Sequence, residues 1–481
     1  MTLAEQLVYA APELILAIGG MVLLLVGVFM GDQRARVIMF GAVALLLAAA
    51  ASAAMLLEMP SASIFSGAFA VDGYAIFAKV IVFVAAAISI LMSSSFLGAP
   101  DLKRFEYPIL IVFAAFGMGL MTSASDLITL YLGLEAQSLA LYILATFNRD
   151  NRRSTEAGLK YFVLGALSSC LLLYGASLVY GFAGSTRFED IAKVASLDGR
   201  QTGLLIGLVF VISGLAFKIS AAPFHMWTPD VYEGAPTPVT AFFAAAPKLA
   251  AMALFGRFII QGFQGAIDDW RPIVAALSVA SMLVGAFSAI TQTNIKRLMA
   301  YSSIGHMGYA LIGLAAGTVA GVSSVLVYMA IYIAMTLGTF ACILLMRRRG
   351  EMVEEVSDLA GAARTNLPLA VMMTVFLFSL AGIPPLAGFF GKWFVFVAAA
   401  KADLLWLAIV GAVISVISCY YYLRVVWFMW FNDPAPTLDR SGGFILNATA
   451  TVSALLMFPL FLGLIAMLND SARGAAAALF G

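Results

Sequence analysis

The sequence is a succession of apolar stretches, each about as long as the 20 residues that a helix needs to cross the hydrocarbon core of a bilayer. Hydrophobic residues make up 63% of the 481 residues and charged residues only 11%, whereas a soluble domain carries about 25% charged residues. The first stretch follows Glu5 and Glu13 instead of a basic segment, so we expect a retained span and not a signal peptide. The composition therefore predicts an all-α integral membrane protein.

Counting stretches of this length predicts 14 transmembrane helices with short connections, the longest of which cover residues 184–201 and 346–364. The predicted centres lie near Leu23, Leu47, Val84, Phe116, Leu134, Leu171, Val211, Met252, Ser281, Ile312, Met335, Leu380, Ile417 and Leu456. Of the 27 Lys and Arg residues, 14 lie in the alternate loops on one side of the predicted membrane, and six lie in the loops on the opposite side. Because basic loops stay inside, we expect both termini to face the outside.

Two spans contain prolines and glycines that interrupt a helix. One interruption covers residues 216–230 in span 7, and the other covers residues 381–393 in span 12. A broken helix at membrane depth is tolerated only inside protein or beside a water-filled cavity, and matching interruptions indicate inverted repeats. We therefore expect three N-terminal helices (1–98), a first five-helix repeat of spans 4–8 (105–262), an inverted second repeat of spans 9–13 (271–432) and a C-terminal helix (442–468).

Five charged residues lie near the middle of apolar spans, where a charge costs between about 3 and about 10 kcal/mol or more. They are Glu135, Lys160, Lys218, Lys248 and Lys392. The simpler interpretations are a structural ion pair, or a lysine that reaches an interface along its apolar stem; the second is strongest for Lys160. Taken together, the five residues predict a path for protons or cations.

Other polar residues in the spans are less informative. Lys79 and Arg257 stand near span ends, so we expect both to reach the membrane surface, and Arg424 approaches an inside loop. The only two histidines, His225 and His306, fall in spans beside proline or glycine. Either is a hydrogen-bonded core residue or a proton relay between lysines, since the reference pKa of histidine is about 6.5.

The sequence lacks the motifs of a redox or nucleotide-binding protein. It has no glycine-rich phosphate loop, no Cys/His metal spacing and no nucleophile elbow. The three cysteines stand alone in apolar runs, and the net charge of +1 argues against a nucleic-acid surface. We therefore expect no cofactor and no metal in this chain.

Two segments carry a resemblance to a known family. They are residues 223–239, the proline-rich run PFHMWTPDVYEGAPTPV, and residues 302–309, SSIGHMGY. The chain resembles the antiporter-like membrane subunits of respiratory complex I, NADH:quinone oxidoreductase, over its whole length. Sodium–proton antiporters of the Mrp type share this ancestry, and topology alone does not separate the two.

The resemblance implies a proton-pumping subunit of an oxidoreductase in a bacterial inner membrane, with both termini in the periplasm. Partners would be neighbouring antiporter-like subunits and small membrane subunits, and FMN and iron–sulfur clusters would be held by other subunits. Glu135 would hold the charge of Lys218, and protons would then pass to Lys248 and Lys392, with Lys160 and His225 on the same polar axis. His306 is a further candidate for the proton relay. The alternatives are a stand-alone cation–proton antiporter and a structural membrane subunit without a channel.

Overall fold

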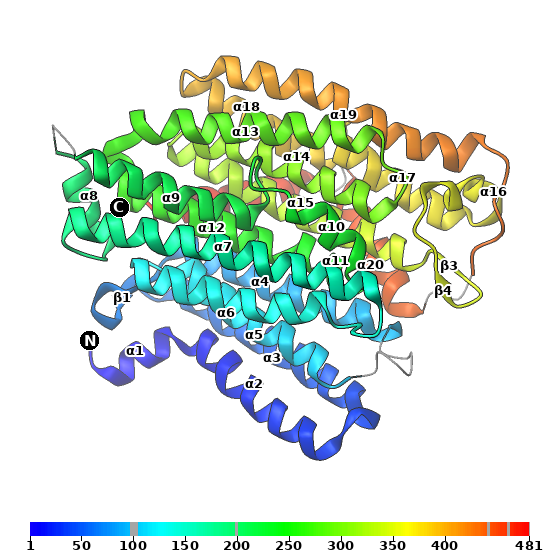
Figure 1. Ribbon diagram of the computed structural model, residues 1–481, viewed down its shortest axis with the longest axis horizontal. Coiled ribbons are helices and arrows are strands. Elements are labelled where there is room, and N and C mark those ends of the chain that lie inside the picture. Colours follow the sequence, from blue (N-terminus) through cyan, green and yellow to red (C-terminus); the bar gives the residue numbers. More distant parts are fainter. Residues whose placement is uncertain (97–103, 198–200, 440–442, 459–461, 481) are drawn as a thin grey trace.

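The computed structural model describes residues 1–96, 104–197, 201–439, 443–458 and 462–480, and its long helices lie side by side (Figure 1). Within these residues, ten helices are long and apolar enough to cross a membrane. The only strands in the described ranges form two small antiparallel hairpins. The prediction of an all-helical membrane protein is therefore confirmed.

Four helices and one hairpin form the N-terminal part. They are α1 (Leu3–Tyr9), α2 (Ala11–Met30), α3 (Ala35–Met55), β1 (Ala62–Ile64), β2 (Phe69–Val71) and α4 (Gly73–Met92). Helix α4 begins where the Asp72 side chain accepts a hydrogen bond from the Ala75 backbone N–H at 2.8 Å, as an N-cap residue does.

The next helices carry the first interruption. They are α5 (Glu106–Ser123), α6 (Leu127–Ala145), α7 (Arg152–Ala183), α8 (Phe188–Ala195), α9 (Thr202–Ile219), α10 (Trp227–Gly234), α11 (Thr237–Ala244) and α12 (Ala246–Phe263). Helices α5 and α6 pack closely because Gly117 has no side chain: a Cβ there would lie 2.4 Å from the backbone nitrogen of Gln137.

The remaining elements carry the second interruption. They are α13 (Ile267–Ile290), α14 (Ile295–Ala315), α15 (Val319–Leu344), β3 (Arg347–Arg348), β4 (Glu351–Met352), α16 (Ala362–Thr365), α17 (Leu367–Ala381), α18 (Ala387–Lys401), α19 (Leu405–Phe431), α20 (Phe444–Leu456) and α21 (Leu462–Ala477). All 14 predicted span centres fall within helices, although three lie near a helix end: Ile312 in α14, Leu380 in α17 and Leu456 in α20.

Within the described residues, three helix breaks lie beside the buried lysines Lys218, Lys248 and Lys392, where the sequence predicted two breaks. The breaks between α9 and α10 and between α17 and α18 are confirmed. The third separates α11 from α12 at Ala245, whose φ of −108° and ψ of −95° are not helical. Pro247 follows in the first turn of α12, and it has no backbone N–H to continue the hydrogen-bond ladder of α11. A single proline among alanines gave no strong sign of this break.

The two chain ends lie at the same end of the molecule, beside β1 and α8, while β3, β4 and α16 lie at the opposite end (Figure 1).

Three of the basic loop residues that were counted to orient the chain, Lys103, Arg200 and Arg440, lie outside the described residues. Of the cysteines, Cys342 is buried, Cys419 is partly exposed and Cys170 is exposed on α7.

Candidate functional site

Lys218 lies in the last turn of α9, directly before the first break, and only 6% of it is exposed. The chain leaves the helix at Ser220, whose φ of 62° is left-handed. The Trp227 indole N–H donates to the freed carbonyl of Phe217 at 2.9 Å. The Lys218 ammonium donates to the Ser138 hydroxyl of α6 at 2.6 Å and lies 5.6 Å from the Tyr142 ring centre. The break thus holds a buried cation against a hydroxyl and an aromatic ring.

Glu135 does not contact Lys218 in this conformation. Its carboxylate accepts a short hydrogen bond from the Ser169 hydroxyl of α7, and the residue is partly exposed. Ser138, one turn further along α6, takes the position next to Lys218. No ion pair joins Glu135 to Lys218 among the described residues, because each has a serine partner instead, so the two groups are apart in this conformation. The sequence could not show which of two neighbouring α6 side chains faces the lysine.

Lys248 lies in the first turn of α12, directly after the third break, and is 1% exposed. Its ammonium makes a short hydrogen bond to the Ser220 hydroxyl, which also accepts from Thr228 at 2.6 Å. The ring centres of Trp227 and Tyr232 lie 5.2 and 6.0 Å from the same nitrogen. Ser220 therefore connects the break that contains Lys218 with the break that contains Lys248.

Lys392 occupies the second predicted break and is 5% exposed. Its ammonium donates to the Ala381 carbonyl at the end of α17 and to the Ser415 hydroxyl of α19, each at 2.8 Å. A cation is favoured at this C-terminal carbonyl. Gly382, with a φ of 86°, leaves room for the side chain, since a Cβ there would lie 2.9 Å from Lys392 Cδ. The Tyr309 ring centre lies 4.7 Å from the ammonium.

His306 is 3% exposed on α14 and is held between two tyrosines of other helices. Its Nδ1 lies 2.7 Å from the Tyr328 hydroxyl of α15, and its Nε2 lies 3.1 Å from the Tyr422 hydroxyl of α19. The Tyr422 hydroxyl is also 2.5 Å from the Ser302 hydroxyl. His306 can therefore accept a proton on one side and donate one on the other.

The sequence analysis did not identify the hydroxyl groups that accept hydrogen bonds from the buried lysines or contact His306. Besides the groups already described, Tyr332 of α15 donates to the Ser303 hydroxyl of α14 at 2.9 Å. The only signal in the sequence was their repetition in apolar helices: the pair Ser302–Ser303, and Tyr328 with Tyr332 one helical turn apart. Such residues are common in cores, so the spacing alone carried little weight.

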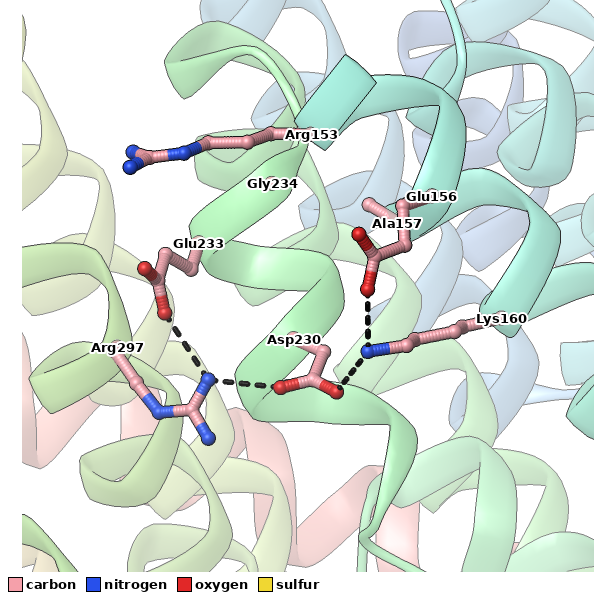
Figure 2. Close-up of a pocket in the computed structure, with 8 residues that line it drawn as sticks. All are labelled: Arg153, Glu156, Ala157, Lys160, Asp230, Glu233, Gly234 and Arg297. Carbon is pink, nitrogen blue, oxygen red and sulfur yellow. Dashed lines mark hydrogen bonds and ion pairs between the residues drawn. The ribbon is translucent and has the colours of Figure 1, made fainter.

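Lys160 lies in an open pocket of about 210 Å³ and not in the buried row (Figure 2). Its side chain is 42% exposed and pairs with Asp230 at 2.7 Å and Glu156 at 2.9 Å. Arg297 of α14 pairs with the other oxygen of Asp230 at 2.8 Å and with Glu233 at 3.0 Å. Asp230 therefore links the two cations, and Lys160 lies apart from Lys218, Lys248 and Lys392 in this conformation. An open pocket allows its ammonium to remain hydrated.

His225 lies in the turn between α9 and α10 and is partly exposed, next to the exposed Met226. In the described part of the chain, it makes no hydrogen bond to Lys218 or Lys248. The structure therefore does not join His225 to the lysine row.

Lys79 and Arg257 do not reach the membrane surface, and that expectation is wrong. Each is 0% exposed: Lys79 pairs with Glu13 at 2.8 Å, and Arg257 pairs with Asp72 at 2.7 Å. Arg424 instead donates short hydrogen bonds to backbone carbonyls at the end of α13. The acidic partners come from remote helices, so inspecting one span at a time could not reveal them.

The comparisons with known proteins agree with the resemblance. A family model described as NADH:quinone oxidoreductase/Mrp antiporter, TM, matches residues 124–418. NADH-quinone oxidoreductase subunit N 1 of Rhizobium meliloti (strain 1021) is 56% identical over 443 residues, which cover 92% of each chain. Subunit N of Rhodospirillum rubrum is 53% identical over 477 residues, which cover 98% of this chain and 97% of that protein.

Solved structures show the same relationship. A chain of respiratory complex I from Thermus thermophilus with bound aureothin has a TM-score of 0.80 and 32% identity, covering 94% of this chain and 98% of that one. A chain of the Mrp complex from Dietzia sp. DQ12-45-1b has a TM-score of 0.85 at 22% identity and covers all of both chains, which shows a shared fold alone. The chain belongs to the family of NADH:quinone oxidoreductase and Mrp antiporter membrane subunits.

Proposed function

We propose that this chain is a proton-translocating subunit of NADH:quinone oxidoreductase, as the names of its relatives indicate. The observation that carries the proposal is that three buried lysines each lie beside a helix break and contact a hydroxyl group. Buried ammonium groups that have hydroxyl partners at broken helices are suited to pass protons through membrane protein.

The proposed topology has 14 spans, with inverted repeats at spans 4–8 and 9–13 and the domain limits predicted above. The breaks between α9 and α10 and between α17 and α18 support this division, since each carries a buried lysine. In this arrangement the chain lies in a bacterial inner membrane with both termini in the periplasm. The location of both chain ends at one end of the molecule is consistent with this (Figure 1).

In the proposed mechanism, protons enter at the ionic pocket of Lys160 and Asp230 (Figure 2), which Arg153 in the first turn of α7 also lines. They pass between Lys218 and Lys248 through Ser220 and neighbouring water, with His225 at the rim of the same break. His306 and its tyrosines then connect the first half of the chain to Lys392.

Glu135 would act as a movable counter-charge in this mechanism. A carboxylate 4 Å from an ammonium stabilises it by about 4 kcal/mol at an effective dielectric of about 20, and by about half as much at 8 Å. The structure has Glu135 bonded to Ser169 and Lys218 bonded to Ser138. We therefore assign this conformation to the separated state, in which Lys218 releases its proton toward Lys248.

The redox chemistry would take place in partner subunits that hold FMN and iron–sulfur clusters. This chain would contribute proton transfer driven by contacts with neighbouring antiporter-like and small membrane subunits. Within the described residues, no three His, Cys, Asp or Glu side chains are grouped so that they could hold a metal ion.

The test is proton pumping in membrane vesicles that contain the assembled complex with Lys248→Ala. We expect pumping to be lost, and Lys248→Arg not to restore it, because a guanidinium keeps its proton at every relevant pH. Lys401→Ala, at an exposed lysine that ends α18, is the matched control and should pump normally. Normal pumping by Lys248→Ala would exclude the relay and favour a structural subunit. Sodium-dependent transport by the isolated chain would favour the stand-alone antiporter.

A further inference from the structure

Two buried ion pairs lie outside the lysine row, and both include a residue at or on α4. Lys79 of α4 pairs with Glu13 of α2 at 2.8 Å, and Asp72, the N-cap residue of α4, pairs with Arg257 of α12. The second pair is bidentate, with Arg257 Nη1 and Nη2 donating to the two Asp72 oxygens at 2.8 and 2.7 Å. Helix α4 is therefore bound by charge to α2 on one side and to α12 on the other.

Such pairs are weak evidence for stability. The cost of removing two charges from water often exceeds their attraction, and apolar replacement is frequently neutral or stabilising. Charged residues in membrane helices are rare and usually functional. A buried bidentate pair therefore indicates a requirement for a fixed geometry.

The geometry that is fixed is the position of α12. Besides Asp72, Arg257 donates to the Thr122 carbonyl of α5 at 3.1 Å. The Tyr74 hydroxyl of α4 donates to the Ala253 carbonyl of α12 at 2.9 Å. This hydroxyl fits against Gly256, where a Cβ would lie 2.7 Å away. Contacts at two successive turns prevent α12 from both rotating and sliding.

The same helix carries Lys248 at its other end. Because the break at Ala245 separates α12 from α11, the position of Lys248 depends on the body of α12. Arg257 follows Lys248 by nine residues, which is about 13 Å along a rigid helix. A rotation of about 20° would move an atom at the helix surface by roughly 2 Å, enough to break the contact between Lys248 and Ser220.

We propose that Asp72, Tyr74 and Arg257 are positioning residues that hold Lys248 against Ser220 through α12. This inference rests on the proposed proton relay and adds residues that lie outside the lysine row. The neighbouring Lys79–Glu13 pair contacts α2 instead of α12 and has no such role.

The test removes each ion pair in turn without leaving a lone charge. One variant combines Arg257→Met with Asp72→Asn, which retains an N-cap side chain for α4. The matched control combines Lys79→Met with Glu13→Gln, which removes the other buried ion pair of α4. The quantity measured is the ratio of the initial rate of NADH-driven proton pumping to the amount of assembled complex in inverted membrane vesicles, from which any loss of assembled protein cancels.

We expect the ratio in the Arg257/Asp72 variant to fall about as far as in Lys248→Ala, by about tenfold or more, since a misplacement of about 1 Å can cost 100-fold in rate. The control should stay within about twofold of the unaltered protein. A normal ratio in the Arg257/Asp72 variant, or an equal loss in the control, would overturn the proposal.

If the double variant does not assemble, Arg257→Lys tests the positioning role instead. It keeps the charge but loses the bidentate contact, so we expect a several-fold loss per assembled complex, and an unchanged ratio would refute positioning. Lys248→Ala is measured in parallel. If it pumps normally, the relay itself fails; if it does not pump but the Arg257 variants do, only the positioning role fails.

Discussion

Ser220→Ala tests the connection between the two breaks most directly. Among the described residues, the Ser220 hydroxyl is the only hydrogen-bond acceptor for the Lys248 ammonium, and the remaining contacts of this cation are the faces of Trp227 and Tyr232. Lys392 differs, because it donates both to Ser415 and to the Ala381 carbonyl. Loss of one serine should therefore affect the two lysines unequally.

A hydrogen bond to a charged group contributes about 1.5–3 kcal/mol, which corresponds to about 10- to 100-fold in an equilibrium or a rate. We expect Ser220→Ala to slow proton pumping by about that factor. In Ser415→Ala the backbone carbonyl remains, so we expect a loss of about threefold or less.

The assay is the initial rate of NADH-driven acidification in inverted vesicles, normalised to assembled complex. Thr228→Val is the control, since it removes the other hydrogen bond of Ser220 and leaves the contact with Lys248 in place. Equal losses in Ser220→Ala and Ser415→Ala, or a normal rate in Ser220→Ala, would refute the reasoning.

Three further outcomes are expected. Glu135→Gln and Lys218→Ala should each reduce proton uptake severely, and the double variant should be no worse than either single one; additive losses would show that the two act separately. Lys160→Ala should lower pumping by about threefold or less, because exposed ion pairs contribute only about 0–1 kcal/mol, and complete loss of pumping would contradict this. Gly388→Ala should lower the free energy of unfolding by at least about 1–3 kcal/mol, because a Cβ there would lie 1.9 Å from a backbone carbonyl oxygen of α17. Gly181→Ala, where the space around the Cβ is open, should leave the melting temperature of the complex unchanged.

The three charged residues that the structure places in the buried row were all found from the sequence. Lys218, Lys248 and Lys392 stood out because a charge in an apolar span is costly wherever the helix lies. The same rule did not separate them from Lys160, which the structure places in an open pocket. It also gave too little weight to Lys79 and Arg257, whose acidic partners stand 66 and 185 residues away in the chain.

The sequence by itself determined the all-helical membrane class and two of the three breaks beside the buried lysines. These follow from local physics: the length of the apolar stretches, and prolines that cannot donate a backbone hydrogen bond. Only the tertiary structure determined which side chain each buried cation contacts: Lys218 contacts Ser138, and Lys248 contacts Ser220. The physical reason is that Glu135 and Ser138 are both polar and stand one helical turn apart on α6, so the sequence does not distinguish them as partners of Lys218. Only the rotation of the packed helices brings Ser138 within hydrogen-bond distance of the lysine.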